Sequence, residues 1–182
     1  MPGKHGEGFR QPELADTLQR IADQGIDGFY QGKTAQLIVQ EMERHDGLIT
    51  LQDLKNYRPR IRQPVHGTYR GHDIYSMSPP SSGGTHIVQI LNILEGYPLA
   101  EFGHNSAAGI HHMAEAMKLA YADRAEYLGD TDFVEVPLKG LTSKAYAEAL
   151  RKTIDPAEAR PSTEISAGNP GAYESPETTH FS

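Results

Sequence analysis

Residues 69–96 read YRGHDIYSMSPPSSGGTHIVQILNILEG, and here the predicted secondary structure changes from strands to helix. The strands belong to residues 64–77, which are rich in Tyr, Val and Ile and carry two glycines, a pattern that predicts two strands joined by a turn. The loop SPPSSGG, residues 78–84, ends the strands, and the apolar run THIVQILNILEG predicts a helix after it. Helices are predicted on both sides of this centre.

Upstream, Pro12 can occupy the first turn of a helix that runs to about Gln24, and Gly25 ends it. Its apolar residues share one face: Leu14, Leu18 and Ile21. A second helix is predicted over Thr34–His45, and its inward residues are Leu37, Ile38 and Met42.

A short third helix is predicted after Thr50, because Thr50 and Asp53 have the spacing of a capping box. Downstream of the central stretch a long helix follows, with one apolar stripe: Ile110, Met113, Met117 and Leu128. Residues 155–177 are rich in Pro, Ser, Thr, Glu and Gly, and we expect a mostly irregular segment there that leads into a strand at Thr178.

Composition excludes several classes of protein. With 37% hydrophobic and 23% charged residues, the bulk of the chain has the composition of a folded domain. A net charge of -7 argues against a nucleic-acid surface, and the absence of Cys excludes disulfides and thiolate chemistry. The first residues, MPGKHGEGFRQ, lack the apolar core of a signal peptide, and we expect no membrane span.

The loop SPPSSGG permits two interpretations. A helix N-terminus favours an anion, so the loop could cradle a phosphate or carboxylate, or present Ser81 or Ser82 as a nucleophile. It lacks the G-x-S-x-G elbow and the Walker-A Lys, however. The simpler interpretation is a rigid turn shaped by Pro and Gly, and we favour it.

Two further groups could carry chemistry. His111 and His112 are neighbours on a helix and point about 100° apart, so they are poorly placed to chelate one metal ion. The second group could serve acid–base work but is more simply explained as charge pairing: Asp123, Arg124, Glu126, Asp130 and Asp132.

The chain ends with ESPETTHFS, residues 174–182. A Thr hydroxyl becomes a good nucleophile when an adjacent base activates it, and an N-terminal α-amine can be that base. Thr178 would gain such an amine only if the bond before it were cut. Two threonines at the start of a strand are a weak signal by themselves, because Thr favours strands in general.

Taken together, five strings strongly resemble bacterial γ-glutamyltranspeptidase, in the family's order, from about Phe9 to Ser182. They are GFYQGKTAQLIVQEM, HDGLITLQDL, the central stretch quoted above, AEAMKLAYADRAEYLGDTDFVEVP and ESPETTHFS. In that family one precursor cuts itself into a large and a small subunit, and the small subunit begins with a catalytic Thr in a T-T-H-x-S string. The resemblance therefore implies that Thr178 is the nucleophile and Glu177–Thr178 the processing site.

The resemblance also implies the fold and the reaction. We expect an α/β (α+β) structure, a helix-rich part of the αββα sandwich of N-terminal nucleophile (Ntn) hydrolases. Residues 1–177 would be the C-terminal part of the large subunit, and residues 178–182 the start of the small one. The substrates implied are glutathione and other γ-glutamyl compounds, with water, amino acids or peptides as acceptors and with no metal or organic cofactor. We interpret His180 as structural, because the α-amine already supplies a base.

In the family, the glutamate-binding Arg lies upstream of the matched region, and the oxyanion glycines lie in the small subunit. We therefore expect the 182-residue chain alone to be inactive, with unpaired strand edges and bare apolar faces. Full family members would be periplasmic or secreted. The alternatives are a self-processing cephalosporin acylase or poly-γ-glutamate-processing enzyme, a non-catalytic assembly fragment, and, more distantly, a serine hydrolase.

Overall fold

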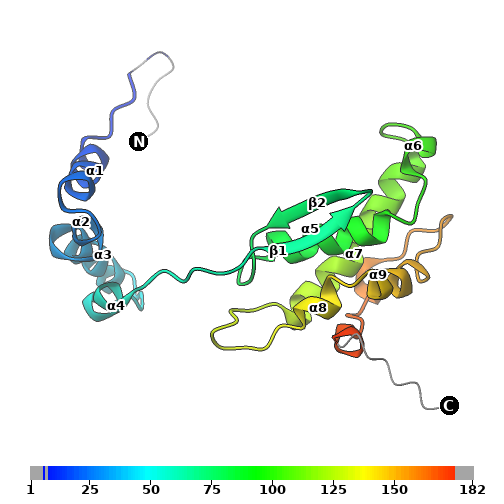
Figure 1. Ribbon diagram of the computed structural model, residues 1–182. Coiled ribbons are helices and arrows are strands. Elements are labelled where there is room, and N and C mark those ends of the chain that lie inside the picture. The colour runs from blue at the N-terminus through cyan, green and yellow to red at the C-terminus, as the bar shows by residue number, and fades with distance from the viewer. Residues whose placement is uncertain (1–5, 7, 175–182) are drawn as a thin grey trace. The chain divides into compact units, whose positions relative to one another are not determined.

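The computed structural model describes residue 6 and residues 8–174, and it divides into two compact units (Figure 1). The first unit extends to Ile61 and the second begins at Arg62, a division that the sequence analysis does not anticipate. The predicted processing site, Glu177–Thr178, and the predicted strand that includes His180 lie outside the described residues.

The first unit consists of helices α1 (Pro12–Gln24), α2 (Asp27–Tyr30), α3 (Gly32–Arg44) and α4 (Leu51–Asn56). The predicted bounds of α1 are confirmed, and the chain leaves the helix at Gly25 with a φ of 60°, a conformation that favours glycine. The predicted capping box of α4 is confirmed as well. The Thr50 hydroxyl accepts from the Asp53 N–H at 3.2 Å, and the Asp53 carboxylate accepts from the Thr50 N–H at 2.8 Å.

A polar contact joins the helices of this unit. Thr34, on α3, donates its hydroxyl hydrogen to the Gly28 carbonyl at 2.7 Å and accepts from Arg20 Nε at 3.0 Å. A Cβ on Gly28 would overlap the Arg20 carbonyl, so α1 and α2 approach closely only because this residue is glycine.

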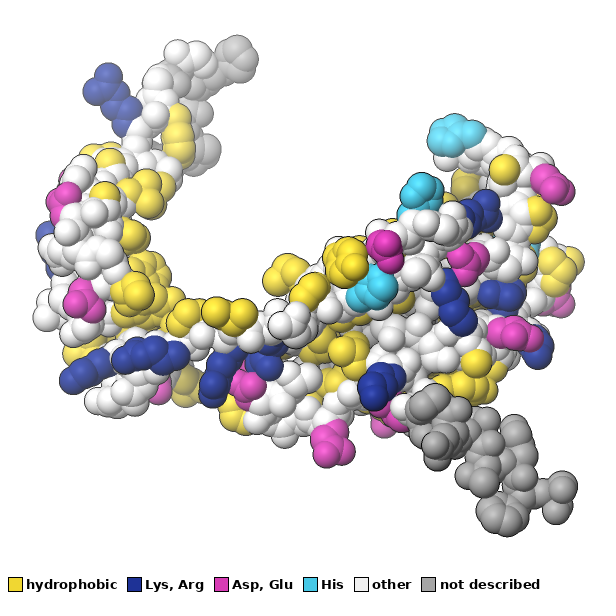
Figure 2. Space-filling view, viewed as in Figure 1, with side chains coloured by type: hydrophobic (Ala, Val, Ile, Leu, Met, Phe, Trp, Pro, Cys, Tyr) yellow, Lys and Arg dark blue, Asp and Glu magenta, His cyan; other side chains and the backbone are white. Residues whose placement is uncertain are grey.

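Much of the apolar surface of the first unit is exposed. The prediction that Leu37 points inward is wrong, because its side chain is 48% exposed. Leu14 and Leu18 share a face of α1 as predicted, but both side chains are exposed. Figure 2 shows hydrophobic side chains, in yellow, on the surface of the protein. Among the described residues of this unit, the buried hydrophobic residues are Ala35 and Leu54.

The second unit opens with a hairpin of β1 (Val65–Tyr69) and β2 (His72–Ser76), the one sheet in the described part of the chain. Tyr69 pairs with His72, which leaves Arg70 and Gly71 as the turn. Both have positive φ, 50° and 83°, as a type I′ hairpin turn requires. The predicted strands and their joining turn are confirmed.

The hairpin lies along α5 (Ser82–Leu94), as Figure 1 shows. On its other side α5 packs against α7 (Ala107–Tyr127) and α9 (Lys144–Arg151). The remaining elements are α6 (Leu99–Phe102), α8 (Leu138–Leu141) and two 3-10 turns, η1 (Ser162–Glu164) and η2 (Pro170–Tyr173). The core contains Ile93, Leu94, Ala116, Leu119, Leu141, Tyr146, Ala147, Leu150 and Ile154. Over the described residues, the prediction of a helix-rich α/β structure is confirmed.

Helix α7 buries the face opposite to the one that its apolar stripe predicts to be buried. Of that stripe, Leu128 packs against the core, whereas Ile110, Met113 and Met117 are roughly half exposed. The buried face carries the polar side chains of His112, Glu115 and Asp123. Within residues 6 and 8–174, no helix is long and apolar enough to cross a membrane.

Candidate functional site

The SPPSSGG loop has the geometry of a rigid turn. Ser81 caps α5 by accepting from the Gly83 N–H at 3.3 Å. His86 Nδ1 donates to the Ser82 carbonyl at 2.7 Å, so this imidazole serves the backbone rather than a serine hydroxyl. A Cβ on Gly84 would overlap the Met77 carbonyl, which explains the glycine at the strand-to-helix junction. These contacts support the turn interpretation over a nucleophilic serine.

The side chains of His111 and His112 point in different directions. Their ring planes are 89° apart, with centroids separated by 5.3 Å. His111 Nε2 donates to the Asp155 carbonyl at 2.7 Å, and His112 Nδ1 donates to the Ala108 carbonyl at 2.8 Å. In the described part of the chain, no group of three or more His, Cys, Asp or Glu side chains could hold a metal ion.

The predicted carboxylate group is split between two places. Asp130 and Asp132 both pair with Arg62, at 2.9 Å and 3.0 Å. Arg124 and Glu126 are exposed, whereas Asp123 is fully buried. The interpretation as charge pairing therefore suits Asp130 and Asp132 but not Asp123.

Asp123 is the centre of a buried hydrogen-bond network. Its Oδ2 accepts from Gln89 Nε2 at 2.5 Å and from the Tyr146 hydroxyl at 2.8 Å. Its Oδ1 accepts from the Gly168 N–H at 2.8 Å. Burial, together with the hydrogen bond to Asp123, raises the pKa of Tyr146, so its hydroxyl remains a donor at neutral pH. One carboxylate thus joins α5, α7 and α9 to the C-terminal segment.

Gly168 is held from both sides, and we call this arrangement the Gly168 anchor. Asp123 accepts from its N–H, and the Tyr127 hydroxyl donates to its carbonyl at 2.7 Å. Asp123 and Tyr127 lie four residues apart on α7 and so share a face. A Cβ on Gly168 would overlap the Tyr146 hydroxyl, which leaves room for glycine alone.

A second contact holds the chain at the last described residue. Glu174 Oε1 accepts from the Gly140 N–H at 2.7 Å, and we call this contact the Glu174 anchor. Pro170, in η2, is buried, and a Cβ on Gly140 would overlap its carbonyl. In Figure 1, η2 lies beside α8, as the contacts between these elements require.

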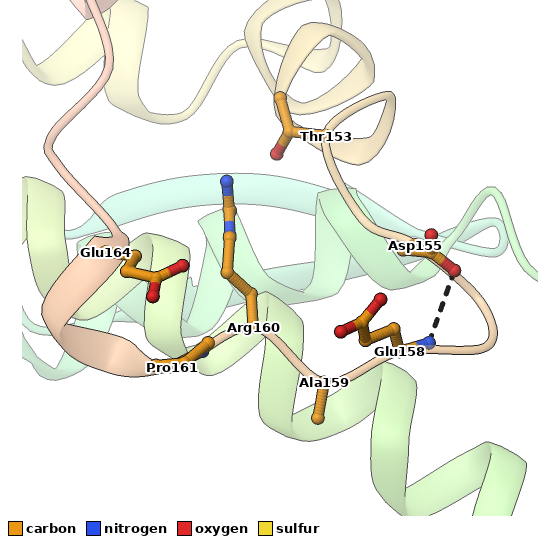
Figure 3. A pocket seen from close by; sticks show the side chains of 7 residues that line it. All are labelled: Thr153, Asp155, Glu158, Ala159, Arg160, Pro161 and Glu164. Carbon is orange, nitrogen blue, oxygen red and sulfur yellow. Dashed lines mark hydrogen bonds between the residues drawn. The ribbon is translucent and has the colours of Figure 1, made fainter.

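The start of this segment lines an open pocket of about 260 Å³ (Figure 3). Asp155 accepts from the Glu158 N–H at 3.2 Å, the contact dashed in the figure. The side chain of Arg160 extends between Glu164 and Thr153. Its Nε and Nη2 atoms are buried without a hydrogen-bond partner among the described residues. A single Arg in an irregular segment carries no sequence pattern, so the burial of these guanidinium nitrogens of Arg160 is not predictable from the sequence.

Comparisons with known proteins find matches along nearly the whole chain. Residues 2–182 match the family model described as gamma-glutamyltranspeptidase. The chain is 52% identical over 181 residues to the glutathione hydrolase proenzyme of Escherichia coli (strain K12), covering 100% of this chain and 31% of that protein. It therefore spans about a third of the length of the curated relatives it matches.

Solved structures superpose on most of this chain. The crystal structure of Helicobacter pylori gamma-glutamyltranspeptidase superposes with a TM-score of 0.82 at 50% identity, covering 90% of this chain and 47% of that one. A cephalosporin acylase from Bacillus halodurans superposes with a TM-score of 0.72 at 34% identity, covering 82% of this chain and 27% of that one.

Proposed function

Since this chain belongs to the gamma-glutamyltranspeptidase family, we propose that the protein is a glutathione hydrolase and γ-glutamyltransferase that matures by cutting itself at Glu177–Thr178. The observation that carries the proposal is the 52% identity to a glutathione hydrolase proenzyme along the whole chain. The family match continues through residue 182 and so includes Thr178, to which we assign the nucleophilic hydroxyl.

Self-cleavage begins with attack of Thr178 Oγ on the carbonyl carbon of Glu177. The peptide C–N bond breaks, its nitrogen takes up a proton, and an ester joins Glu177 to Oγ. Water then hydrolyses the ester, which leaves a carboxylate on Glu177 and a free α-amine on Thr178. That amine can accept the hydroxyl proton in the next reaction. A Thr hydroxyl without such a base is a weak nucleophile.

Transfer repeats the same chemistry on the substrate. Thr178 Oγ attacks the γ-glutamyl amide of glutathione, the amine nitrogen leaves with a proton, and a γ-glutamyl ester remains on Thr178. Water, an amino acid or a peptide then takes the acyl group. Oriented N–H donors stabilise the oxyanion in both steps, each worth about 3–4 kcal/mol. The expected periplasmic or secreted location belongs to the same proposal.

The test uses the full-length protein and three forms: wild type, Thr178→Ala and Thr178→Ser. Thr178→Ala removes the attacking oxygen, so we expect a single uncut chain and no hydrolysis of a γ-glutamyl anilide. Thr178→Ser keeps the oxygen and should retain measurable cleavage and turnover. Electrophoresis and anilide release measure both, and normal two-chain processing of Thr178→Ala would refute the assignment of Thr178.

A second candidate is a cephalosporin acylase, because an acylase with that substrate name shares this fold. The ratio of kcat/KM for a γ-glutamyl anilide to that for a cephalosporin side-chain amide separates the two activities. We expect the anilide to be preferred, and a preference for the cephalosporin would favour the acylase. A poly-γ-glutamate substrate is tested by the same competition.

A further inference from the structure

We propose that the outer edge of β2 binds a third β-strand in the full-length protein, and that this strand comes from the same polypeptide, outside the 182 residues of this chain. This interaction surface does not depend on the proposed activity. Three features of the hairpin support it: its hydrogen-bonding pattern, a difference between its two edges, and the side chains beside the open edge.

The register shows which backbone groups point away from the hairpin. The residues that flank the Arg70–Gly71 turn form a hydrogen-bonded pair, and along an antiparallel ladder such pairs alternate with pairs that exchange no hydrogen bonds. Asp73 faces Thr68 in the first pair of this second kind, and Tyr75 faces His66 in the next one. The N–H and carbonyl groups of Asp73 and Tyr75 therefore point outward, along the free edge of β2.

The outer edge of β1 is partly closed. The ammonium group of Lys144, on α9, donates to the Thr68 carbonyl at 2.6 Å and to the Glu95 carboxylate at 2.5 Å. Glu95 also accepts from the Arg70 N–H at 2.6 Å, which holds the tip of the hairpin at the same place. Lysine side chains at strand edges obstruct pairing with another strand. A further strand could not pair along the whole edge of β1 without displacing Lys144.

The outer edge of β2 carries no such obstacle. Among the described residues, the outward N–H and carbonyl groups of Asp73 and Tyr75 have no hydrogen-bond partner. The strand HDIYS contains neither Pro nor Lys, and its main neighbours are β1 and α5. In Figure 1, β2 lies on the side of the hairpin away from α9. An open edge of this kind is a template for an added strand.

The side chains beside this edge are apolar and exposed. Tyr75 is 66% exposed, and Met77, directly after β2, is 70% exposed. The Tyr75 ring stacks on His66, with centroids 4.5 Å apart, but nothing else among the described residues covers it. A strand paired with β2 would place its side chains next to Tyr75, at the spacing at which cross-strand neighbours stabilise a sheet.

The same polypeptide is the favoured source of this strand. The chain spans 31% of the length of its E. coli relative, so most of the length of that relative lies outside the matched region. A strand that is covalently linked to the hairpin has a high effective concentration at its edge, whereas a second copy of the protein must bind from solution. We therefore assign the edge to an intramolecular partner.

Amide hydrogen exchange in the full-length wild-type protein tests the proposal. Residue-resolved mass spectrometry measures the exchange rates of the Asp73 and Tyr75 amides, and a third strand should slow both by at least about 10²-fold relative to an unstructured peptide. The His66 amide, on the outer edge of β1, is the internal reference and should exchange faster than both. Unprotected amides at Asp73 and Tyr75 would overturn the proposal. Protection that disappears on dilution would assign the edge to a second copy and overturn the intramolecular partner.

A proline substitution gives an independent test. Tyr75→Pro removes the outward N–H and leaves the ladder to β1 intact, a change that an unpaired edge strand tolerates. Tyr75→Ala loses the same ring but keeps the N–H, so it is the matched control. We expect the melting temperature of full-length Tyr75→Pro to lie at least about 3 °C below that of Tyr75→Ala.

The corresponding pair on β1 separates strand pairing from a general effect of proline. His66→Pro and His66→Ala should differ by less than the two Tyr75 variants do, because the His66 N–H faces the edge that we expect to stay unpaired. Equal melting temperatures for Tyr75→Pro and Tyr75→Ala, or equal differences at both edges, would contradict a third strand on β2. If Tyr75→Pro does not fold, amide exchange in the wild type decides the question.

Discussion

At the scale of single residues, His86 shows how burial sets a titration. It is 6% exposed on α5, its Nδ1 donates to the Ser82 carbonyl, and its Nε2 has no hydrogen-bond partner among the described residues. Burial lowers the pKa of His86, and the charge of Arg124 acts in the same direction. The hydrogen bond to Ser82 and the charge of Asp123 oppose this effect. The folded protein therefore favours the neutral form of the His86 ring.

The lowered pKa predicts a loss of stability in acid. The unfolded chain binds the proton at about pH 6.5, before the folded chain does, so this stabilisation is present above that pH and is lost as pH falls through the folded-state value. We expect the melting temperature of the full-length wild type to fall more between about pH 7.5 and pH 5 than that of His86→Gln. The same change at exposed His104 is the control, and identical pH profiles for wild type and His86→Gln would contradict the assignment.

Residue-scale prediction from the sequence succeeds where the partners are neighbours. The Thr50 and Asp53 capping box needs only a three-residue spacing, which the sequence shows directly, and the structure confirms it. The local sequence predicts charge pairing along a helix for Asp123, but its donors, Gln89, Tyr146 and Gly168, lie 34, 23 and 45 residues away. No local sequence pattern predicts such a network, because folding brings together residues that are far apart in the sequence.

At the scale of elements, the junction between the hairpin and α5 depends on one glycine. Buried Gly84 leaves no room for a Cβ beside the Met77 carbonyl, and backbone atoms there cannot move aside cheaply. We expect Gly84→Ala to cost about 1–3 kcal/mol, seen as a lower melting temperature of the full-length protein.

Gly83→Ala is the matched control for this change. A Cβ on Gly83 would meet the Ser81 hydroxyl at 3.5 Å, an ordinary contact, and Ala favours helix over Gly by up to about 1 kcal/mol. It should therefore be neutral or slightly stabilising. Equal destabilisation by both changes would mean that the Met77 contact does not limit this junction.

Element bounds were predicted well where a residue enforces them. Pro12 and Gly25 delimit α1 by their backbone preferences, and the glycine-containing turn separates β1 from β2. The faces of helices were predicted less well, since Ile110, Met113 and Met117 form an apolar stripe on the exposed side of α7. Periodicity shows that a stripe exists, but the neighbours of the helix decide which side is covered.

At the scale of the whole molecule, large apolar side chains lie open in both units. Ile61 is 100% exposed, Leu48 91% and Phe133 85%. Folded proteins rarely leave such surface bare, and it commonly marks an interface. The chain spans 31% of the length of its E. coli relative, which is consistent with surfaces that further chain covers in the complete protein.

The short span of the chain relative to its relatives leads to a prediction about the 182 residues made as an isolated polypeptide. We expect no cleavage at Glu177–Thr178 and no hydrolysis of glutathione or γ-glutamyl anilides. Cleavage requires Thr178 Oγ to be held against the Glu177 carbonyl, with N–H donors aimed at the developing oxyanion. By the family resemblance, these donors lie in the small subunit. Without these donors, stabilisation of the transition state falls by about 3–4 kcal/mol per donor, which is a factor of 10² to 10³ in the cleavage rate.

Intact-mass spectrometry after prolonged incubation tests this prediction. The full-length protein under the same conditions is the positive control, and Thr178→Ala in the isolated polypeptide reports any contaminating protease. We expect the isolated polypeptide to keep its full mass while the full-length protein separates into two chains. Loss of the mass of residues 178–182 from the wild-type polypeptide, but not from Thr178→Ala, would show that the large-subunit side alone assembles a working cleavage site. The oxyanion donors would then have to be sought among the backbone N–H groups of this chain.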